Sequence, residues 1–220
     1  MDKIVIPQEI IDHLPTFAND IRAAFKLRIS EPKLIGRVTI PANDDMAERE
    51  VFILVDEIFK GKKYPKKEGE TPAESRRRQK LNRKLNEKTL AAYCHAADVI
   101  FVYRSILKET LGARGIEHYL AHEIAHAIDK ESVKHSTSGT AKGVSQRFLD
   151  KYFCRKTEFE AEMAAIEAVE IPFIAENLPI IIAQYLNCVS GYVGGWGRDK
   201  KYSKIFVTRL KAALEKHNLF

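Results

Sequence analysis

Residues 119–129 read Tyr-Leu-Ala-His-Glu-Ile-Ala-His-Ala-Ile-Asp, with two histidines four residues apart. Apolar residues surround them on nearly every side, which predicts a buried helix. Side chains at this spacing lie one above the other on a helix, so His122 and His126 can direct two nitrogens at one metal ion. Glu123 points elsewhere and can take a proton from a metal-bound water. The alternative is an ordinary helix whose histidines and glutamate pair with other side chains.

The composition is that of a globular protein. The 220 residues are 45% hydrophobic and 30% charged, which excludes an intrinsically disordered chain. The most apolar stretch, residues 171–186, is interrupted by prolines and polar residues, so we expect no membrane span. The N-terminus lacks the pattern of a secretory signal, and three widely spaced cysteines are typical of a reducing compartment. These features predict a cytoplasmic protein with no membrane association.

The order of the expected elements predicts an α+β fold in a single domain over residues 1–220. β-branched and apolar runs predict strands at 33–40, 50–56 and 98–103. Besides the motif helix, helical spacing predicts helices over about 16–28, 71–91, 157–169, 176–189 and 200–216, the first of them beginning after Pro15. We expect a small mixed sheet packed on the motif helix, with a mainly helical C-terminal part.

A basic segment over residues 60–88 carries the positive charge of the chain. It holds twelve Lys or Arg against four Glu, a local net charge of +8 in a chain of +6. The sequence predicts an exposed loop and helix inserted at about 60–90, with Thr71-Pro72-Ala73-Glu74 as a capping box that has Pro at the first helical position. Arg76, Arg77 and Arg78 are candidates for binding a nucleic acid or an acidic partner. The alternative is a solvated charged face.

A catalytic zinc usually takes three protein ligands and leaves the fourth position to water. No histidine follows the motif at a short helical distance, and His135 lies in a Ser/Thr/Gly-rich loop without a motif around it. Residues 158–162 read Glu-Phe-Glu-Ala-Glu, with a glutamate at every second position. On a helix Glu160 faces away from the other two, whereas Glu158 and Glu162 share a face and either can reach the ion.

The two segments together resemble the gluzincin metallopeptidases, whose second metal-binding helix carries Glu, an aromatic residue and then x-Ala-Asp/Glu. They are most similar to the anthrax lethal-factor-like peptidases, which include the Pro-Pro endopeptidases, and to the phage-immunity peptidases that cleave repressors. The resemblance covers only these two short segments. It implies a zincin-like fold, one Zn²⁺ per chain, and hydrolysis of a peptide bond in a protein or peptide substrate.

By this resemblance Glu158 is the third metal ligand beside His122 and His126, and Glu123 is the general base. Glu162 is then a carboxylate that hydrogen-bonds a ligating histidine and fixes its tautomer. Asp129, which follows the motif helix, is a second candidate for that role.

The oxyanion of the transition state needs a further donor. Lethal-factor-like enzymes carry a Tyr seven residues before the ligand Glu, but here Lys151 occupies that place and Tyr152 follows it. Tyr152 is the expected donor, with Tyr192 and Arg198 as alternatives.

Two other functions are compatible with the sequence. One is a nucleic-acid-associated binding protein with a structural or vestigial zinc site, in which a structural ion would have four protein ligands. The other is an effector or regulator whose peptidase acts on a single partner.

Overall fold

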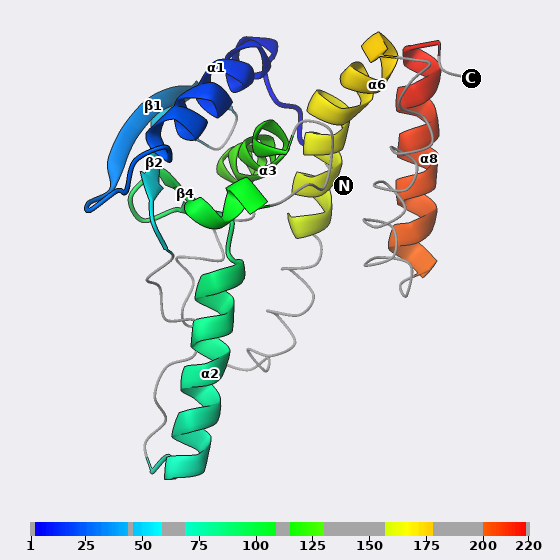
Figure 1. Ribbon diagram of the computed structural model, residues 1–220. Helices are drawn as coiled ribbons and strands as arrows, with labels where there is room; N and C mark the ends of the chain where they lie inside the picture. The colour runs from blue at the N-terminus through cyan, green and yellow to red at the C-terminus, as the bar shows by residue number, and fades with distance from the viewer. Residues whose placement is uncertain are drawn as a thin grey trace.

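The computed structural model describes residues 3–43, 46–58, 69–108, 115–129, 157–177 and 200–218, which form an α+β fold (Figure 1). The first part contains α1 (Gln8–Ala24), β1 (Lys33–Ile40), β2 (Arg49–Asp56), α2 (Pro72–Lys88), β3 (Ala91–Cys94), β4 (Val99–Tyr103), the 3₁₀ helix η1 (Arg104–Lys108) and α3 (Ile116–Ile128). A helix over 157–165 continues through the π-helix η2 (Ile166–Glu170) into α6 (Ile171–Asn177), and α8 spans Lys200–Lys216. No helix in these ranges is both long and apolar enough to cross a membrane.

The sheet is mixed, as expected, with the strand order β1-β2-β4-β3. β2 pairs with β1 in antiparallel and with β4 in parallel orientation, and β3 pairs with β4 in antiparallel orientation at the far edge. Alternate residues of the central strand β2 are fully buried (Val51, Ile53 and Val55). This alternation indicates that one face of the sheet lies on the core.

That face packs against α1 and α3. Leu14, Ala18 and Ile21 of α1 join Leu120 and Ile124 of α3 and the buried strand residues in one hydrophobic cluster. Figure 1 shows α3 between the sheet on one side and the helix of residues 157–177 on the other. The motif helix is therefore enclosed on both sides, which explains why eight of its thirteen residues are apolar.

The C-terminal part is mainly helical. Phe159, Met163 and Ile166 are buried in a second cluster against Ile205 and Leu214 of α8. An ion pair supports this packing, because Arg209 of α8 reaches Glu160 and Glu167.

Three expectations for the secondary structure were wrong. Pro15 lies inside α1 rather than before it. Its missing N–H costs the helix one hydrogen bond, but burial of the apolar face of α1 outweighs that loss. The helix predicted over 71–91 ends at Lys88, and pairing with β4 makes Ala91–Cys94 a strand that was not predicted. The break expected after Val169 is absent, since η2 carries the helix on into α6. Most of the helix predicted over 176–189 lies outside the described residues.

Candidate metal centre

α3 presents the H-E-x-x-H residues and is fixed at its C-terminal end by the sheet. Arg49 of β2 donates a hydrogen bond to the carbonyl of Ala127 in the last turn of α3. Its Nε also pairs with Oδ1 of Asp98 at 3.1 Å, and the same oxygen accepts the hydroxyl of Tyr93 at 2.5 Å. A cation that satisfies the open carbonyls of a helix end stabilises that end, so Arg49 holds the last turn, which carries His126, in place.

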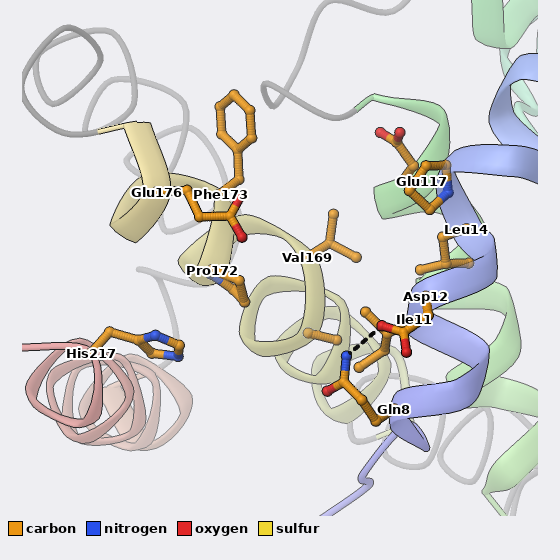
Figure 2. Close-up of a pocket in the computed structure, with 12 residues that line it drawn as sticks. Gln8, Ile11, Asp12, Leu14, Glu117, Val169, Pro172, Phe173, Glu176 and His217 are labelled. Carbon is orange, nitrogen blue, oxygen red and sulfur yellow. Dashed lines mark hydrogen bonds between the residues drawn. The ribbon is translucent and has the colours of Figure 1, made fainter.

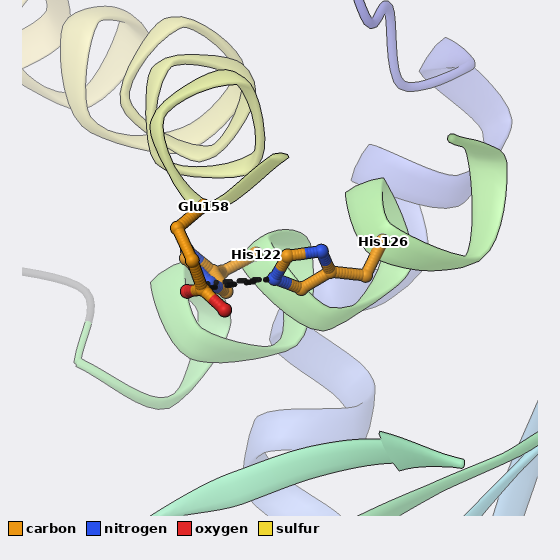
Figure 3. Close-up of side chains that lie close together, drawn as sticks. All are labelled: His122, His126 and Glu158. Atoms are coloured by element: carbon orange, nitrogen blue, oxygen red, sulfur yellow. Dashed lines mark hydrogen bonds and ion pairs between the residues drawn. The ribbon is translucent and has the colours of Figure 1, made fainter. Parts of the chain in front are cut away.

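Three side chains converge beside α3 (Figure 3). The Nε2 atoms of His122 and His126 are 3.1 Å apart, and Oε2 of Glu158 lies 3.3 Å from the first and 3.7 Å from the second. Ligand atoms about 2.0–2.1 Å from a tetrahedral zinc ion are about 3.3 Å apart, so the three measured distances bracket the required spacing. The group offers two imidazole nitrogens and one carboxylate oxygen, a donor set that suits zinc.

The side chains of the cluster shift one another's pKa values. Burial would raise the pKa of Glu158, but contact with His122 and His126 holds that pKa far below its usual range. Burial would likewise lower the pKa of His122, but Glu158 and Glu162 together raise it to about 10. Without an ion, protonated imidazole supplies the positive charge that these carboxylates require.

The other two glutamates of the 158–162 segment have different partners. Glu160 is buried and pairs with Arg209 at 2.5 Å, so it faces away from the histidines as helix geometry predicted. Oε2 of Glu162 lies 2.9 Å from Nδ1 of His122, on the side of the ring opposite Nε2. Glu158 is therefore the one of the three that joins the metal-ligand group.

Glu123 faces the edge of the sheet. Its Oε2 accepts the backbone N–H of Tyr93 in β3 at 2.7 Å. The carboxylate thus has one fixed orientation, next to the edge strand and one residue along α3 from His122. A hydrogen bond of this kind leaves the other carboxylate oxygen available to accept a proton, as a general base does.

Several predicted residues lie elsewhere or outside the described part. Asp129 ends α3, and its N–H donates a hydrogen bond to the carbonyl of Ala125 at 3.0 Å. Burial lowers the pKa of His95, and the negative charge of Asp129 partly offsets that effect. The oxyanion candidates Tyr152, Tyr192 and Arg198 and the loop residue His135 lie outside the described residues. Their assignments stay predictions.

The basic helix α2 projects away from the rest of the described structure (Figure 1). Its capping box is formed as predicted: Glu74 accepts the N–H of Thr71 at 2.9 Å, and Oγ1 of Thr71 accepts the N–H of Glu74 at 3.3 Å. Arg76 and Arg77 are exposed. Arg78 instead pairs with the buried carboxylate of Glu70 at 2.8 Å, so it is less suited than its neighbours to bind phosphate.

The sequence patterns did not single out two histidines near the cluster. His118 lies one helical turn before His122 and is fully buried, and this spacing in the sequence could have pointed to it. His95 follows β3, and burial and then the charge of His126 lower its pKa. No pattern in the sequence places His95 near α3, because the pairing of β3 with β4 brings it there.

A separate cavity of about 440 Å³ lies between α1 and the helix of residues 166–177 (Figure 2). Its walls combine apolar side chains such as Leu14 and Phe173 with the acids Asp12, Glu117 and Glu176. None of the three metal-ligand candidates lines it. The cavity is therefore not the place where a substrate would meet the cluster.

The centre as described is a His₂Glu group with a fixed carboxylate beside it, an arrangement that can hold a divalent cation and move a proton. Comparisons of the chain with protein-family models, curated proteins and solved structures found no match.

Proposed function

We propose that this protein is a zinc-dependent peptidase of the gluzincin type that hydrolyses a peptide bond in a protein or peptide substrate. The observation that carries the proposal is the convergence of His122, His126 and Glu158, whose ligand atoms all lie within 4.8 Å of one another. The wider zincin-like fold belongs to the same proposal, supported by a mixed sheet packed against the motif helix.

Each residue has a defined role in this proposal. His122, His126 and Glu158 would hold the ion, which supplies a Lewis acid that polarises the peptide carbonyl and acidifies water. Glu123 accepts a proton from the attacking water and delivers it to the leaving amine. The N–H of Tyr93 holds the Glu123 carboxylate in one orientation for both transfers. Tyr152 is the proposed donor to the oxyanion.

A structural zinc site would use four protein ligands. Within the described residues, no fourth His, Cys, Asp or Glu joins the group formed by His122, His126 and Glu158. The exposed fraction of the Glu158 side chain is 55%, so the group opens to solvent on that side. Both features favour a catalytic over a structural ion. We also propose a cytoplasmic location, on the cysteine pattern alone.

The experiment is metal analysis of protein purified without chelator, combined with cleavage of a proteome-derived peptide library. We expect about one zinc per chain in the wild type and in Glu123→Gln. Cleavage should fall by about 10²-fold or more in the variant, because the general base is lost. Glu50→Gln, an exposed change on β2, is the control and should leave both unchanged.

The outcomes separate the roles of the residues. Cleavage retained by Glu123→Gln would remove Glu123 from the mechanism. Absence of bound zinc in the wild type, also after incubation with zinc, would refute the metal site. Zinc without cleavage of any library peptide would favour a peptidase restricted to one partner, or the structural site of a binding protein.

A second candidate function is binding of nucleic acid or an acidic partner by α2. Arg76, Arg77, Lys80 and Arg83 are all exposed on this projecting helix. Phosphate contacts by such residues make affinity fall steeply with salt. We expect duplex DNA to bind at low salt and to be released between about 50 and 200 mM salt. No binding at low salt would refute the nucleic-acid role and leave an acidic protein as the partner to test.

A further inference from the structure

Behind His122, a chain of buried charged groups runs away from the ligand cluster. Glu162 is shared between two histidines: its Oε2 is 2.9 Å from Nδ1 of His122, and its Oε1 is 3.2 Å from Nε2 of His118. Nδ1 of His118 lies 3.0 Å from Oε1 of Glu170. The exposed fraction is 0% for the His118 side chain and 2% for that of Glu170. Imidazole and carboxylate thus alternate over four residues from two helices.

The backbone on both sides is arranged to bring these groups together. His118 and His122 are four residues apart on α3 and share a face. Glu162 and Glu170 are eight residues apart, and in a regular α-helix such positions are offset by about 80° around the axis. The π-helix η2 spans Ile166–Glu170, and a π-turn takes up about one extra residue, which removes most of this offset. The irregular turn therefore returns Glu170 to the side of the helix that carries Glu162.

The contacts favour a protonated His118. Ionised carboxylates only accept hydrogen bonds, and a carboxylate faces each ring nitrogen of His118. This arrangement favours hydrogen on both nitrogens, which is the imidazolium form. Burial would lower the pKa of His118, but Glu162 and Glu170 raise it to about 9. A fully buried cation of this kind is stable only between such partners.

We propose that His118 and Glu170 are positioning residues of the metal site: packed in line behind Glu162, this buried pair holds the Glu162 carboxylate in one orientation. Glu162 in turn holds the hydrogen of His122 on Nδ1, which leaves Nε2 as the lone-pair donor toward the cluster. This inference rests on the proposed metal site. Partners one step behind a ligating histidine raise its basicity, and their loss typically weakens metal binding about 10–100-fold.

A purely structural role for the pair makes a different prediction. In that case His118, Glu162 and Glu170 would only join α3 to the second helix, and their loss would lower thermal stability without a specific effect on the metal. Glu160 provides the matched comparison: it lies on the same helix, its exposed fraction is 4%, and it pairs with Arg209. Glu160→Gln removes a buried ionised carboxylate without touching the chain behind His122.

The test compares Glu170→Gln with Glu160→Gln in the full chain. Zinc affinity is measured by competition with a chromophoric chelator, and the ligand environment by the visible absorption of the Co²⁺ form. Glu170 acts on His122 only through His118 and Glu162, so we expect Glu170→Gln to weaken zinc binding by about tenfold, the lower end of the range for direct partners, and to change the Co²⁺ spectrum. Glu160→Gln should stay within about threefold of the wild type, since no part of the chain behind His122 is altered.

Nitrogen NMR of ¹⁵N-histidine-labelled wild type tests the proposal without any substitution. We expect both ring nitrogens of His118 to be protonated at neutral pH, and His122 in the zinc form to carry hydrogen on Nδ1 alone. A neutral His118, or equal effects of the two substitutions on zinc affinity, would overturn the positioning role while leaving the metal site intact. No zinc binding by the wild type would refute the metal site itself, and this inference with it.

Discussion

Zinc binding should weaken as the pH falls, and it should do so already between about pH 9 and pH 7. In the metal-free protein, burial opposes protonation of His122, but Glu158 and Glu162 raise its pKa to about 10. A ligating imidazole must be neutral, so the ion has to displace a proton from His122 across this whole range. The neutral fraction of His122 falls about tenfold per pH unit below its pKa, which gives a loss of about 100-fold in apparent affinity, or about 2.7 kcal/mol.

An ordinary histidine behaves differently, because its pKa of about 6.5 makes it neutral over the same range. The assay is chelator competition at each pH, with calorimetry in two buffers of different ionisation enthalpy to count the protons released. Glu162→Gln removes one of the two carboxylates that contact His122, and should move the onset of the pH dependence to lower pH. A constant zinc affinity from pH 9 to pH 7 with no proton release would refute this account of His122.

Three further predictions concern stability. Arg49→Met removes the cation from the end of α3, so we expect the free energy of unfolding, measured by urea titration, to fall by about 2 kcal/mol. The control is Arg37→Met, which breaks an exposed ion pair on β1 and should change the free energy of unfolding by less than about 0.5 kcal/mol. Gly36→Ala places a Cβ 2.5 Å from the ring of Phe17, so we expect a loss of about 1–3 kcal/mol that Phe17→Leu partly relieves in a double-mutant cycle. The pKa of His118 is higher in the folded than in the unfolded chain, so protonated His118 stabilises the folded state. This stabilisation is complete below about pH 6.5 and should disappear as the pH rises through about 9. A melting temperature of the metal-free protein that stays constant over this range would contradict this prediction.

The part of the site that could be predicted from the sequence is the part set by local geometry. Four-residue spacing on one helix brings His122 and His126 together, and a capping box fixes the start of α2 at Pro72. Helix periodicity also separates Glu160 from Glu158 and Glu162, because positions two apart on a helix face different directions. The contact of Glu158 with the histidines joins residues more than thirty positions apart, and only a resemblance to known peptidases pointed to it.

The remainder depends on packing that no local pattern encodes. The chain behind His122 requires a π-turn, and nothing in the sequence of residues 166–170 predicts one. The N–H that orients Glu123 comes from β3, a strand that forms by pairing with β4 and that the sequence did not predict. Tertiary contacts override local propensity in both cases. These are also the contacts that fix the orientation of Glu123 and His122 within the five-residue motif.

The two halves of the described structure act on α3 from opposite sides, and the centre requires both. The sheet supplies Arg49 and the N–H of Tyr93, which fix the end of the helix and the Glu123 carboxylate. The second helix supplies Glu158 and, through Glu162, the orientation of His122. An ion held by this group would bridge α3 and that helix, so zinc bound only by the folded state should stabilise their packing, by about 4 kcal/mol at a free concentration 1,000 times its dissociation constant. On the proposal made above, the metal site and the junction between the two helices form one structural unit, in which loss of either should weaken the other.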